Sequence, residues 1–345
     1  MLKNTITLLS KVPASLTPQP HTLCGFLAGL HSHGPDASFK SFDDAYEAVI
    51  KVPLDSLNEF EEEIWKAQSR RFIYGNRNLS VVDTVEDATD PQSLAIRQLI
   101  INERPNLVQT AINVASISAP YVATSPNPSP LTQGHFGGLA IALPMFEASS
   151  PPSSSPPRVH IIGAGGCSLP TTLSFFTSHV TAVEPDQSIV EVAKKYFGAD
   201  SELFSLVNMD GSSYLSSLKE DDIDVLIIDA DDGSAPPLSM RDHSFYTALL
   251  PSLSPSAVIA INAIDSPASV ASLSATISSS LPSHTVTIVP PPPAADTDDR
   301  HVLLFACPYD FHPSLPSFLS YFAQHEGLVD SPSAWLKSLE ASFSS

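Results

Sequence analysis

The second half of the chain alternates short runs of β-branched residues with segments of helical periodicity. Between two of these runs, apolar residues recur at helical spacing from Ile189 to Phe197, with Asp186 as a good N-cap and Gly198 behind them. The predicted strands cover residues 159–162, 180–183, 204–208, 224–229 and 257–262. Such an alternation of strands and helices predicts a parallel sheet wrapped by helices.

The end of this pattern is different. A helix predicted from the spacing of Val270, Leu273 and Ile277 is followed by two apolar runs, at 284–289 and 301–307, separated by a proline-rich loop. So short a connection favours an antiparallel pair, whereas dinucleotide dehydrogenases continue with parallel crossovers. We therefore predict an α/β fold with a Rossmann-like, seven-stranded class I methyltransferase sheet and a small N-terminal β-rich appendage.

The appendage is predicted from a less regular pattern. Apolar residues at helical spacing behind Asp55 predict a helix to about Arg70, and a second helix is expected at 134–145. Apolar runs bounded by turn residues predict a small antiparallel sheet. These runs lie near residues 72 and 80 and at 106–114. The run SSPPSSSPP at 149–157 can form neither a helix nor a central strand and is the best domain boundary.

Three parts of the chain follow from these patterns. They are a poorly defined segment 1–54, a helix with a small antiparallel sheet over 55–150, and the α/β domain over 158–345. No apolar run approaches the length of a membrane span, and the N-terminus is too weakly apolar for a secretory signal. We expect a soluble, cytoplasmic protein that does not bind a membrane.

The composition of the chain limits the kinds of partner that we expect it to bind. The 345 residues carry a formal net charge of −20, which repels phosphate backbones and favours a basic protein or an amine as substrate, so we expect no nucleic acid. Cys24, Cys167 and Cys307 are scattered and lack metal spacing, so free thiols and no metal site are expected. The oligomeric state stays open, a homodimer included.

The segment VHIIGAGGCSLP contains a glycine-rich turn between a predicted strand and a predicted helix. Gly163, Ala164, Gly165 and Gly166 form a G-x-G-G motif, in which backbone N–H groups and the helix dipole could meet a ligand. The dinucleotide fingerprint needs a glycine or alanine where this chain has Ser168, so NAD fits poorly. G-x-G-G instead suits a ligand whose carboxylate and amino group lie against the turn.

Acidic residues stand at the ends of the next three predicted strands. Glu184 is placed to accept hydrogen bonds from two ribose hydroxyls, and Asp210, followed by Gly211, to receive the exocyclic amine of adenine. Asp229 would face the reacting end of the same ligand. A single acid at a strand end is commonly a helix cap, but open α/β sheets bind ligands at this edge, and the combination predicts S-adenosylmethionine or its decarboxylated relative.

Four segments resemble, in order and spacing, the spermidine-synthase-like methyltransferases. They are VHIIGAGGCSLP, VTAVEPDQSIVEVAKKYFG, VNMDGSSYL and DVLIIDADD. Within that family the chain is similar to the C-terminal half of the eukaryotic enzymes that methylate translation elongation factor one-alpha. The resemblance covers about residues 65–310, strongly only after 158. It implies that 158–345 is an S-adenosylmethionine-binding methyltransferase domain acting on a protein lysine or N-terminal amine.

Methyl transfer to an amine requires a neutral nitrogen aligned with the S–CH₃ bond and shielded from water. We expect Asp229 to orient the amine, and Asp231 or Asp232 to attract its cationic form and help remove the proton. The alternative is that Asp231 and Asp232 form an exposed acidic turn without a catalytic role. Pro236, Pro237 and the segment to Tyr246 are expected to form one wall of the acceptor cleft.

Two other functions stay open. Aminopropyl transfer to a polyamine suits the fold and the acidic charge, because spermidine synthases place acids at the positions of Asp229 and Asp232. The chain lacks their Tyr-His-Glu signature before the first strand of the α/β domain; His135 is its only remnant. A non-enzymatic module that keeps the fold is the third hypothesis, which the full set of glycines and acids does not favour.

Overall fold

The computed structural model describes residues 70–76, 78–85, 95–103, 108–114, 138–149, 155–199, 202–231, 236–290 and 301–308. The chain divides into two compact units, one of Met1–Arg71 with Thr84–Ser93 and one of Phe72–Asp83 with Leu94–Ser345. Almost all described residues belong to the second unit, which contains the larger sheet and most of the smaller one. The predicted helix from Asp55 lies outside the described residues, except that Arg70 is the first residue of a strand.

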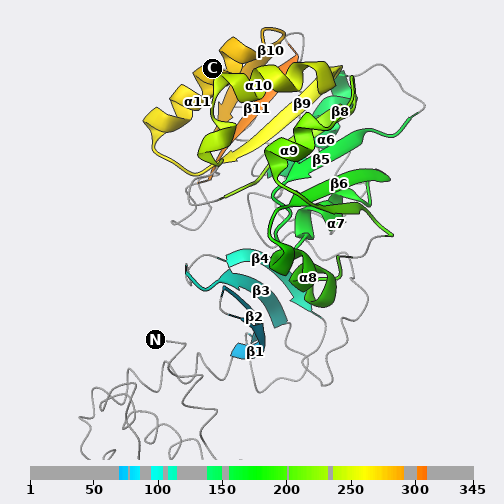
Figure 1. The fold of residues 1–345 in the computed structure, drawn as a ribbon, viewed down its shortest axis with the longest axis vertical. Helices are drawn as coiled ribbons and strands as arrows, with labels where there is room; N and C mark the ends of the chain where they lie inside the picture. The colour runs from blue at the N-terminus through cyan, green and yellow to red at the C-terminus, as the bar shows by residue number, and fades with distance from the viewer. Residues whose placement is uncertain are drawn as a thin grey trace, which may run out of the picture. The chain divides into compact units, whose positions relative to one another are not determined.

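A seven-stranded sheet forms the centre of the second unit, with strand order β10-β11-β9-β8-β5-β6-β7 (Figure 1). Its parallel strands are β5 (Arg158–Ile162), β6 (His179–Glu184), β7 (Ser205–Asn208), β8 (Ile223–Ile228) and β9 (Leu253–Ala263). The antiparallel strands are β10 (His284–Val289) and β11 (Val302–Pro308). The predicted class I methyltransferase sheet is therefore confirmed, including its antiparallel pair.

Side chains of the central strands alternate between two apolar layers. In β8, Val225 and Ile227 join one buried cluster and Leu226 and Ile228 the other, and all six residues of the strand are buried. A strand buried on both faces explains the continuous apolar run in the sequence. β5 is likewise buried along its last four residues.

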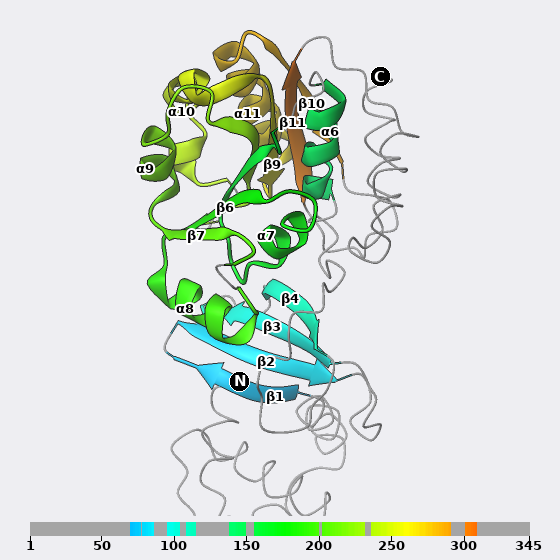
Figure 2. The same ribbon diagram turned by 90° about the vertical axis from the view of Figure 1, so that its right-hand side faces the viewer.

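Helices cover both faces of this sheet (Figure 2). α6 (Ala142–Ser149) and α7 (Ser168–Leu173) contribute to the first cluster. α9 (Gly211–Ser216), α10 (His243–Leu249) and α11 (Pro267–Ser280) contribute to the second. The short 3₁₀ helices η1 (Leu238–Met240) and η2 (Leu250–Ser252) flank α10. The doubly covered sheet leaves its strand ends as the places where polar side chains can meet a ligand.

α8 (Gln187–Tyr196) begins where the periodicity predicts, and Asp186 caps it by accepting a hydrogen bond from the Ser188 N–H over 2.7 Å. Gly198 follows in the left-handed region at φ 68°. Ile189 and Val192 of α8 share a buried cluster with Leu79 and Leu99 of the smaller sheet. One face of α8 therefore covers the N-terminal sheet.

The N-terminal sheet has four strands in the order β1-β2-β3-β4. They are β1 (Arg70–Gly75), β2 (Leu79–Val85), β3 (Ala95–Ile101) and β4 (Val108–Val114), and β3 pairs antiparallel with β4. The three predicted runs correspond to β1, β2 and β4, and β3 was not predicted. Because the contacts place this sheet in one compact unit with the α/β part, the run at 149–157 does not separate compact units.

The predicted helix at 134–145 differs from the observed one. Residues 138–140 are helical, Ile141 forms a turn, and α6 then continues to Ser149, four residues beyond the prediction. The Ser149 hydroxyl donates to the Phe146 carbonyl over 3.0 Å and so satisfies one backbone acceptor in the last turn. In the part of the chain that the structure describes, no helix is long and apolar enough to cross a membrane.

Candidate functional site

A cavity of about 210 Å³ lies at the carboxyl ends of the parallel strands. Eight of the predicted site residues line it: Gly163, Ala164, Gly165, Glu184, Asp210, Gly211, Asp229 and Asp231. Gly166 is buried behind the lining, and Asp232 lies outside the described residues. Residues predicted from separate motifs, over a span of almost seventy positions, therefore surround one space.

The glycine-rich turn needs glycine for two separate reasons. Gly163 has φ +91° and Gly165 φ +50°, in the left-handed region that side chains disfavour. A Cβ on Gly163 would lie 2.4 Å from the backbone oxygen of Asp229. The turn is thus packed against the end of β8, and this contact brings the turn and Asp229 to the same side of the cavity.

The N–H groups of this turn have partners within the protein. Gly163 and Ala164 donate to the Val183 carbonyl over 3.0 and 3.2 Å, and Gly165 donates to the Glu184 Oε2 over 3.2 Å. Gly166 donates to the Thr110 Oγ1 over 2.8 Å. The neighbouring strand and Thr110 thus supply internal acceptors for the N–H groups that were expected to meet a ligand. The turn gives the cavity a narrow backbone whose only side chain among the lining residues 163–165 is the methyl group of Ala164.

Glu184 ends β6 and lies at the cavity with its two carboxylate oxygens fixed by backbone donors. Oε2 accepts from Gly165, and Oε1 accepts from the Asp186 N–H over 3.1 Å. The residue is only 6% exposed, and burial raises the pKa of Glu184 to about 7, against the opposing effect of the N–H donors. Carboxylate oxygens have further lone pairs, so Glu184 can accept hydrogen bonds from a pair of hydroxyl groups.

Asp210 and Gly211 mark the beginning of α9. Asp210 is the N-cap, and its Oδ1 accepts a hydrogen bond from the Ser213 N–H over 2.9 Å. Asp210 therefore has the helix-capping role that is common for an acid at a strand end. The residue is nevertheless exposed to the cavity that it lines. A Cβ on Gly211 would lie 2.4 Å from the Ile162 Cγ2 and 2.8 Å from the Met240 Cε, so a side chain here would have to displace both neighbours.

Asp229 follows β8 directly and is the most constrained acid of the cavity. Its N–H donates to the Ile162 carbonyl over 2.8 Å, and its Oδ1 accepts from the Asn262 side-chain amide over 2.7 Å. Burial raises the pKa of Asp229 to about 7; the Asn262 hydrogen bond opposes this rise and the charge of Asp231 adds to it. Asp229 can therefore exist as acid and as carboxylate near neutral pH.

Several lining residues were not predicted. Ile101 of β3, with Gln109 and Thr110 of β4, brings the N-terminal sheet to the cavity. The polar pair Gln109–Thr110 within the run at 106–114 was the one available signal. Asn262, which donates to the Asp229 carboxyl group, and His301, which contacts Asn262, gave no signal, because neither belongs to a recognisable motif.

The predicted acceptor wall is only partly found. Pro237 lines the cavity together with Ser239 and Met240 of η1. Tyr246, the predicted end of the wall, is instead fully buried in the core, where it stacks edge-on against Phe245 at 5.1 Å between ring centroids. Within the described ranges no group of three or more His, Cys, Asp or Glu side chains could hold a metal ion.

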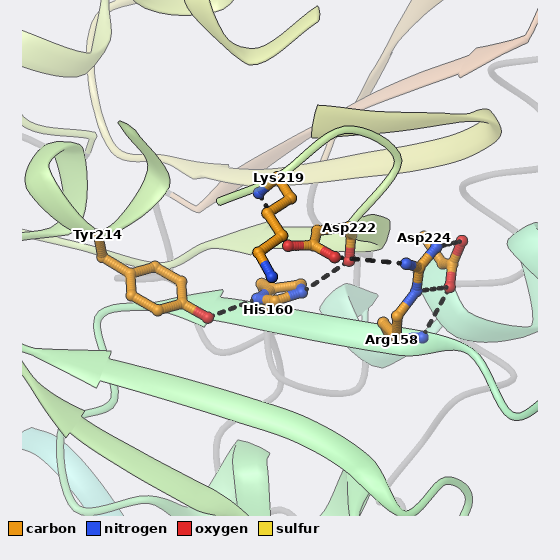
Figure 3. A network of polar contacts seen from close by, with 6 residues as sticks. All are labelled: Arg158, His160, Tyr214, Lys219, Asp222 and Asp224. Atoms are coloured by element: carbon orange, nitrogen blue, oxygen red, sulfur yellow. Dashed lines mark hydrogen bonds and ion pairs between the residues drawn. The ribbon is translucent and has the colours of Figure 1, made fainter. Parts of the chain in front are cut away.

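A second polar network lies at the opposite edge of the sheet (Figure 3). The ring of His160 contacts the Tyr214 hydroxyl at 2.8 Å through Nδ1 and the Asp222 carbonyl at 3.1 Å through Nε2. Arg158 donates to both carboxylate oxygens of Asp224, over 2.9 and 3.1 Å. Because His160 lies on β5 and Tyr214 on α9, the contact holds the helix that begins at Asp210 against the sheet.

The sequence profile of the spermine/spermidine synthase domain matches residues 141–290. A sequence search of curated proteins gives no match. A probable spermidine synthase from Corynebacterium glutamicum superposes with a TM-score of 0.54 at 16% identity, covering 79% of this chain and 93% of the other. This likeness establishes a common fold.

Two further solved structures are similar at lower scores. Human methyltransferase-like protein 13 in complex with SAH has a TM-score of 0.42 at 21% identity, covering 62% of this chain and 93% of that one. Spermidine synthase from Thermotoga maritima has a TM-score of 0.46 at 18% identity, covering 78% and 90%. Residues 141–290 thus match the spermine/spermidine synthase domain, and the chain shares its fold with the probable spermidine synthase.

Proposed function

We propose that the protein is an S-adenosylmethionine-dependent N-methyltransferase whose acceptor is an amine, most simply a lysine or the N-terminal amine of a basic protein. The observation that carries this proposal is the convergence of the glycine-rich turn, Glu184, Asp210 and Asp229 on one cavity. Their order along the strand ends matches the order of groups along an adenosyl ligand. A translation elongation factor is the acceptor suggested by the sequence resemblance.

The chemistry of the lining fits the cofactor. Glu184 can accept hydrogen bonds from two ribose hydroxyls, because each of its oxygens has a lone pair that the backbone N–H donors do not use. Asp210 is exposed at the same cavity and can accept from the exocyclic amine of adenine. The turn at Gly163 and Gly165 leaves room for the amino-acid end of the ligand, since a side chain there would clash or strain the backbone.

When bound, the cofactor supplies a methyl group on a sulfonium. The residues of this chain would then position the acceptor nitrogen. Asp229 would accept a hydrogen bond from the amine and so orient the nitrogen lone pair for in-line attack on the methyl group, with the C–S bond as the one to be broken. The proton leaves the nitrogen for a carboxylate, and Asp231 at the cavity is placed to receive it or to pass it to water.

The carboxylates of Asp229 and Asp231 favour binding of the acceptor in its ammonium form, but they also oppose loss of its proton. Negative charge near an ammonium raises its pKa, so orientation is the firmer role for Asp229. A pKa of about 7 softens this conflict, because the Asp229 carboxylate then accepts a proton from the amine more readily than an ordinary aspartate does. Net charge of −20 supports attraction of a basic acceptor.

Aminopropyl transfer to a polyamine is the second candidate, and the match of residues 141–290 to the spermine/spermidine synthase domain favours it. Occupancy of the turn's N–H groups by Val183, Glu184 and Thr110 also supports it, since decarboxylated S-adenosylmethionine has no carboxylate to place against the turn. The reacting atoms of the two cofactors are the same sulfonium and its neighbouring carbons. The transferred group therefore decides between the functions.

The deciding experiment incubates the purified protein with two labelled cofactors. S-adenosylmethionine labelled in its methyl group is supplied with a cell extract, and decarboxylated S-adenosylmethionine with putrescine. Label in one protein band, mapped to an amine, supports the proposal; formation of labelled spermidine would establish the second candidate instead. Asp229→Asn should abolish the transfer, while Asp242→Asn, at an exposed acid outside the cavity, should leave it unchanged. If no group is transferred from either cofactor, both enzymatic functions are refuted.

A further inference from the structure

We propose that Asn262 and His301 act together as a positioning pair that fixes the Asp229 carboxyl group in the cavity and favours its deprotonated form. The hydrogen bonds stand on the structure alone, whereas their effect on turnover rests on the proposed function. Neither residue belongs to the sequence motifs, and neither lines the cavity. Their role is to act through Asp229.

Three side chains form a continuous series of hydrogen bonds. The Asn262 Nδ2 donates to the Asp229 Oδ1 over 2.7 Å, and the His301 Nδ1 lies 2.9 Å from the Asn262 Oδ1. Asn262 is 3% exposed, so no water would replace these partners if the amide lost them. Any other arrangement would leave buried polar groups of the amide unsatisfied, so this one is favoured.

The direction of each hydrogen bond follows from the chemistry of the groups. An amide carbonyl can only accept, so His301 must carry a proton on Nδ1. With its oxygen held by His301, the Asn262 amide presents its NH₂ group to Asp229. An amide turned by 180° would place its oxygen against the carboxylate and its NH₂ against the imidazole N–H, which are two repulsive contacts. His301 thereby sets the orientation of the donor that Asp229 receives.

The register of β8, β9 and β11 explains how these residues meet. Ile228 of β8 is registered with Ile261 of β9, which brings the next residues, Asp229 and Asn262, side by side. Leu303 of β11 is registered with Asn262 across the antiparallel pair. His301 immediately precedes β11, so the chain enters this strand at the end of the sheet where the cavity lies.

The consequence for Asp229 is a balance between burial and hydrogen bonding. Burial favours the neutral acid, and Asp231 adds a repulsive charge, while the Asn262 donor favours the carboxylate. Glu184 and Asp210 line the same cavity and add further negative charge when ionised. A fixed N–H donor on Oδ1 also restricts rotation of the carboxyl group, so the acceptor amine would meet it in one orientation.

The test titrates Asp229 directly, by NMR of aspartate carboxyl carbons in the isotopically labelled full-length protein. The Asp229 signal is assigned by its loss in Asp229→Asn. We expect Asn262→Leu, which keeps the volume and removes the donor, to raise the pKa of Asp229 by about one unit. His301→Phe should raise it by a smaller amount, and His301→Gln, whose amide can donate to Asn262, should restore most of the wild-type value.

A second measurement follows turnover across pH. For a group with a pKa of about 7, a rise of about one unit lowers its deprotonated fraction at pH 7 about fivefold, so kcat of Asn262→Leu should fall by this factor and recover in part above pH 8. A purely structural role would lower activity equally at all pH values. His243→Phe, at an exposed histidine on α10, is the control and should leave the Asp229 titration in place.

The outcomes separate the two proposals. An unchanged Asp229 titration in both Asn262→Leu and His301→Phe would overturn the positioning pair, whatever the activity. A shifted titration without any transferase activity would support the pair and refute the proposed function. If Asn262→Leu does not fold, as judged by circular dichroism, the half-buried His301 still carries the test through its Phe and Gln variants.

Discussion

The Thr110 hydroxyl of the N-terminal sheet accepts a hydrogen bond from the Gly166 N–H over 2.8 Å, joining residues that are 56 positions apart in the sequence. Thr110 also lines the cavity, as does Gly165 next to Gly166. The small sheet is therefore part of the candidate site and fixes the position of its glycine-rich turn.

This contact predicts that Gly166→Ala is destabilising. A Cβ at position 166 would lie 2.6 Å from the Thr110 Cγ2, too close for a methyl group, and overpacking of this kind costs about 1–3 kcal/mol. Thr110→Ser removes that methyl group and keeps the acceptor oxygen. In a double-mutant cycle measured by chemical denaturation, Thr110→Ser should recover part of the loss; strictly additive effects would contradict the contact.

A buried ion pair predicts a second stability effect. Arg97 of β3 and Asp83 of β2 are 4% and 0% exposed, and the Arg97 Nε and Nη2 donate to the two carboxylate oxygens over 2.7 and 2.9 Å. Nη1 donates to the Tyr196 carbonyl at the end of α8 over 2.9 Å. Arg97→Met leaves the Asp83 charge buried and should cost about 3–5 kcal/mol in urea unfolding.

The matching double variant tests the cause. Arg97→Met combined with Asp83→Leu removes both charges and should be clearly more stable than Arg97→Met alone. Equal stability of the single and double variants would show that lost packing, and not the unpaired carboxylate, dominates.

The raised pKa values of Asp229 and Glu184 predict how the stability of the ligand-free protein depends on pH. Both groups bind protons more tightly when folded than when unfolded, so their contribution to stability is fully present below about pH 4 and is lost as pH rises to about 7. Asp229→Asn removes one of these penalties and should stabilise the ligand-free protein at pH 8 by about 2 kcal/mol while abolishing transfer.

Thermal unfolding at pH 5 and pH 8 checks this prediction, with Asp242→Asn as the matched surface variant. The advantage of Asp229→Asn over wild type should shrink at pH 5. An advantage of the same size at both pH values would mean that the ionisation of Asp229 is not its source.

The network of Figure 3 predicts the opposite dependence at acid pH. Burial lowers the pKa of His160 below its usual value of 6.5, so the unfolded chain binds this proton more readily than the folded one. Stability is therefore lost as pH falls below about 6.5, by up to about 1.4 kcal/mol per unit. His160→Gln should show a shallower loss between pH 6.5 and 5 in urea unfolding.

Tyr214→Phe provides the companion measurement. It removes the hydroxyl that contacts the His160 Nδ1 at 2.8 Å and should cost about 1 kcal/mol at pH 7.5, where the ring is neutral. If His160→Gln and wild type lose stability in parallel as the pH falls, the buried imidazole is not the titrating group.

Much of the fold could be predicted because local signals agree with the tertiary structure. α8 combines an apolar stripe with Asp186 at its start and Gly198 at its end, and β8 is apolar throughout because both of its faces are buried. β3 could not be predicted in this way. Its Arg97 is buried only because Asp83 of another strand neutralises it, and a sequence pattern does not reveal that pairing.

The candidate site shows the same division. Gly163, Glu184, Asp210 and Asp229 were predictable because parallel strands end at one edge of a sheet. Thr110, Asn262 and His301 depend on which strands become neighbours, and their own sequence contexts are unremarkable. The occupied N–H groups of the glycine-rich turn likewise follow from the position of the Val183 carbonyl on the adjoining strand.

The packing of α8 on the N-terminal sheet has a consequence for biosynthesis. The apolar face formed by Leu79, Val81 and Leu99 is covered by Ile189 and Val192, which leave the ribosome about a hundred residues later. Until then the nascent strands expose an apolar surface and open edges, a state prone to aggregation. We expect the emerging chain to depend on chaperones during this interval, and its sheet to be completed only once α8 has been translated.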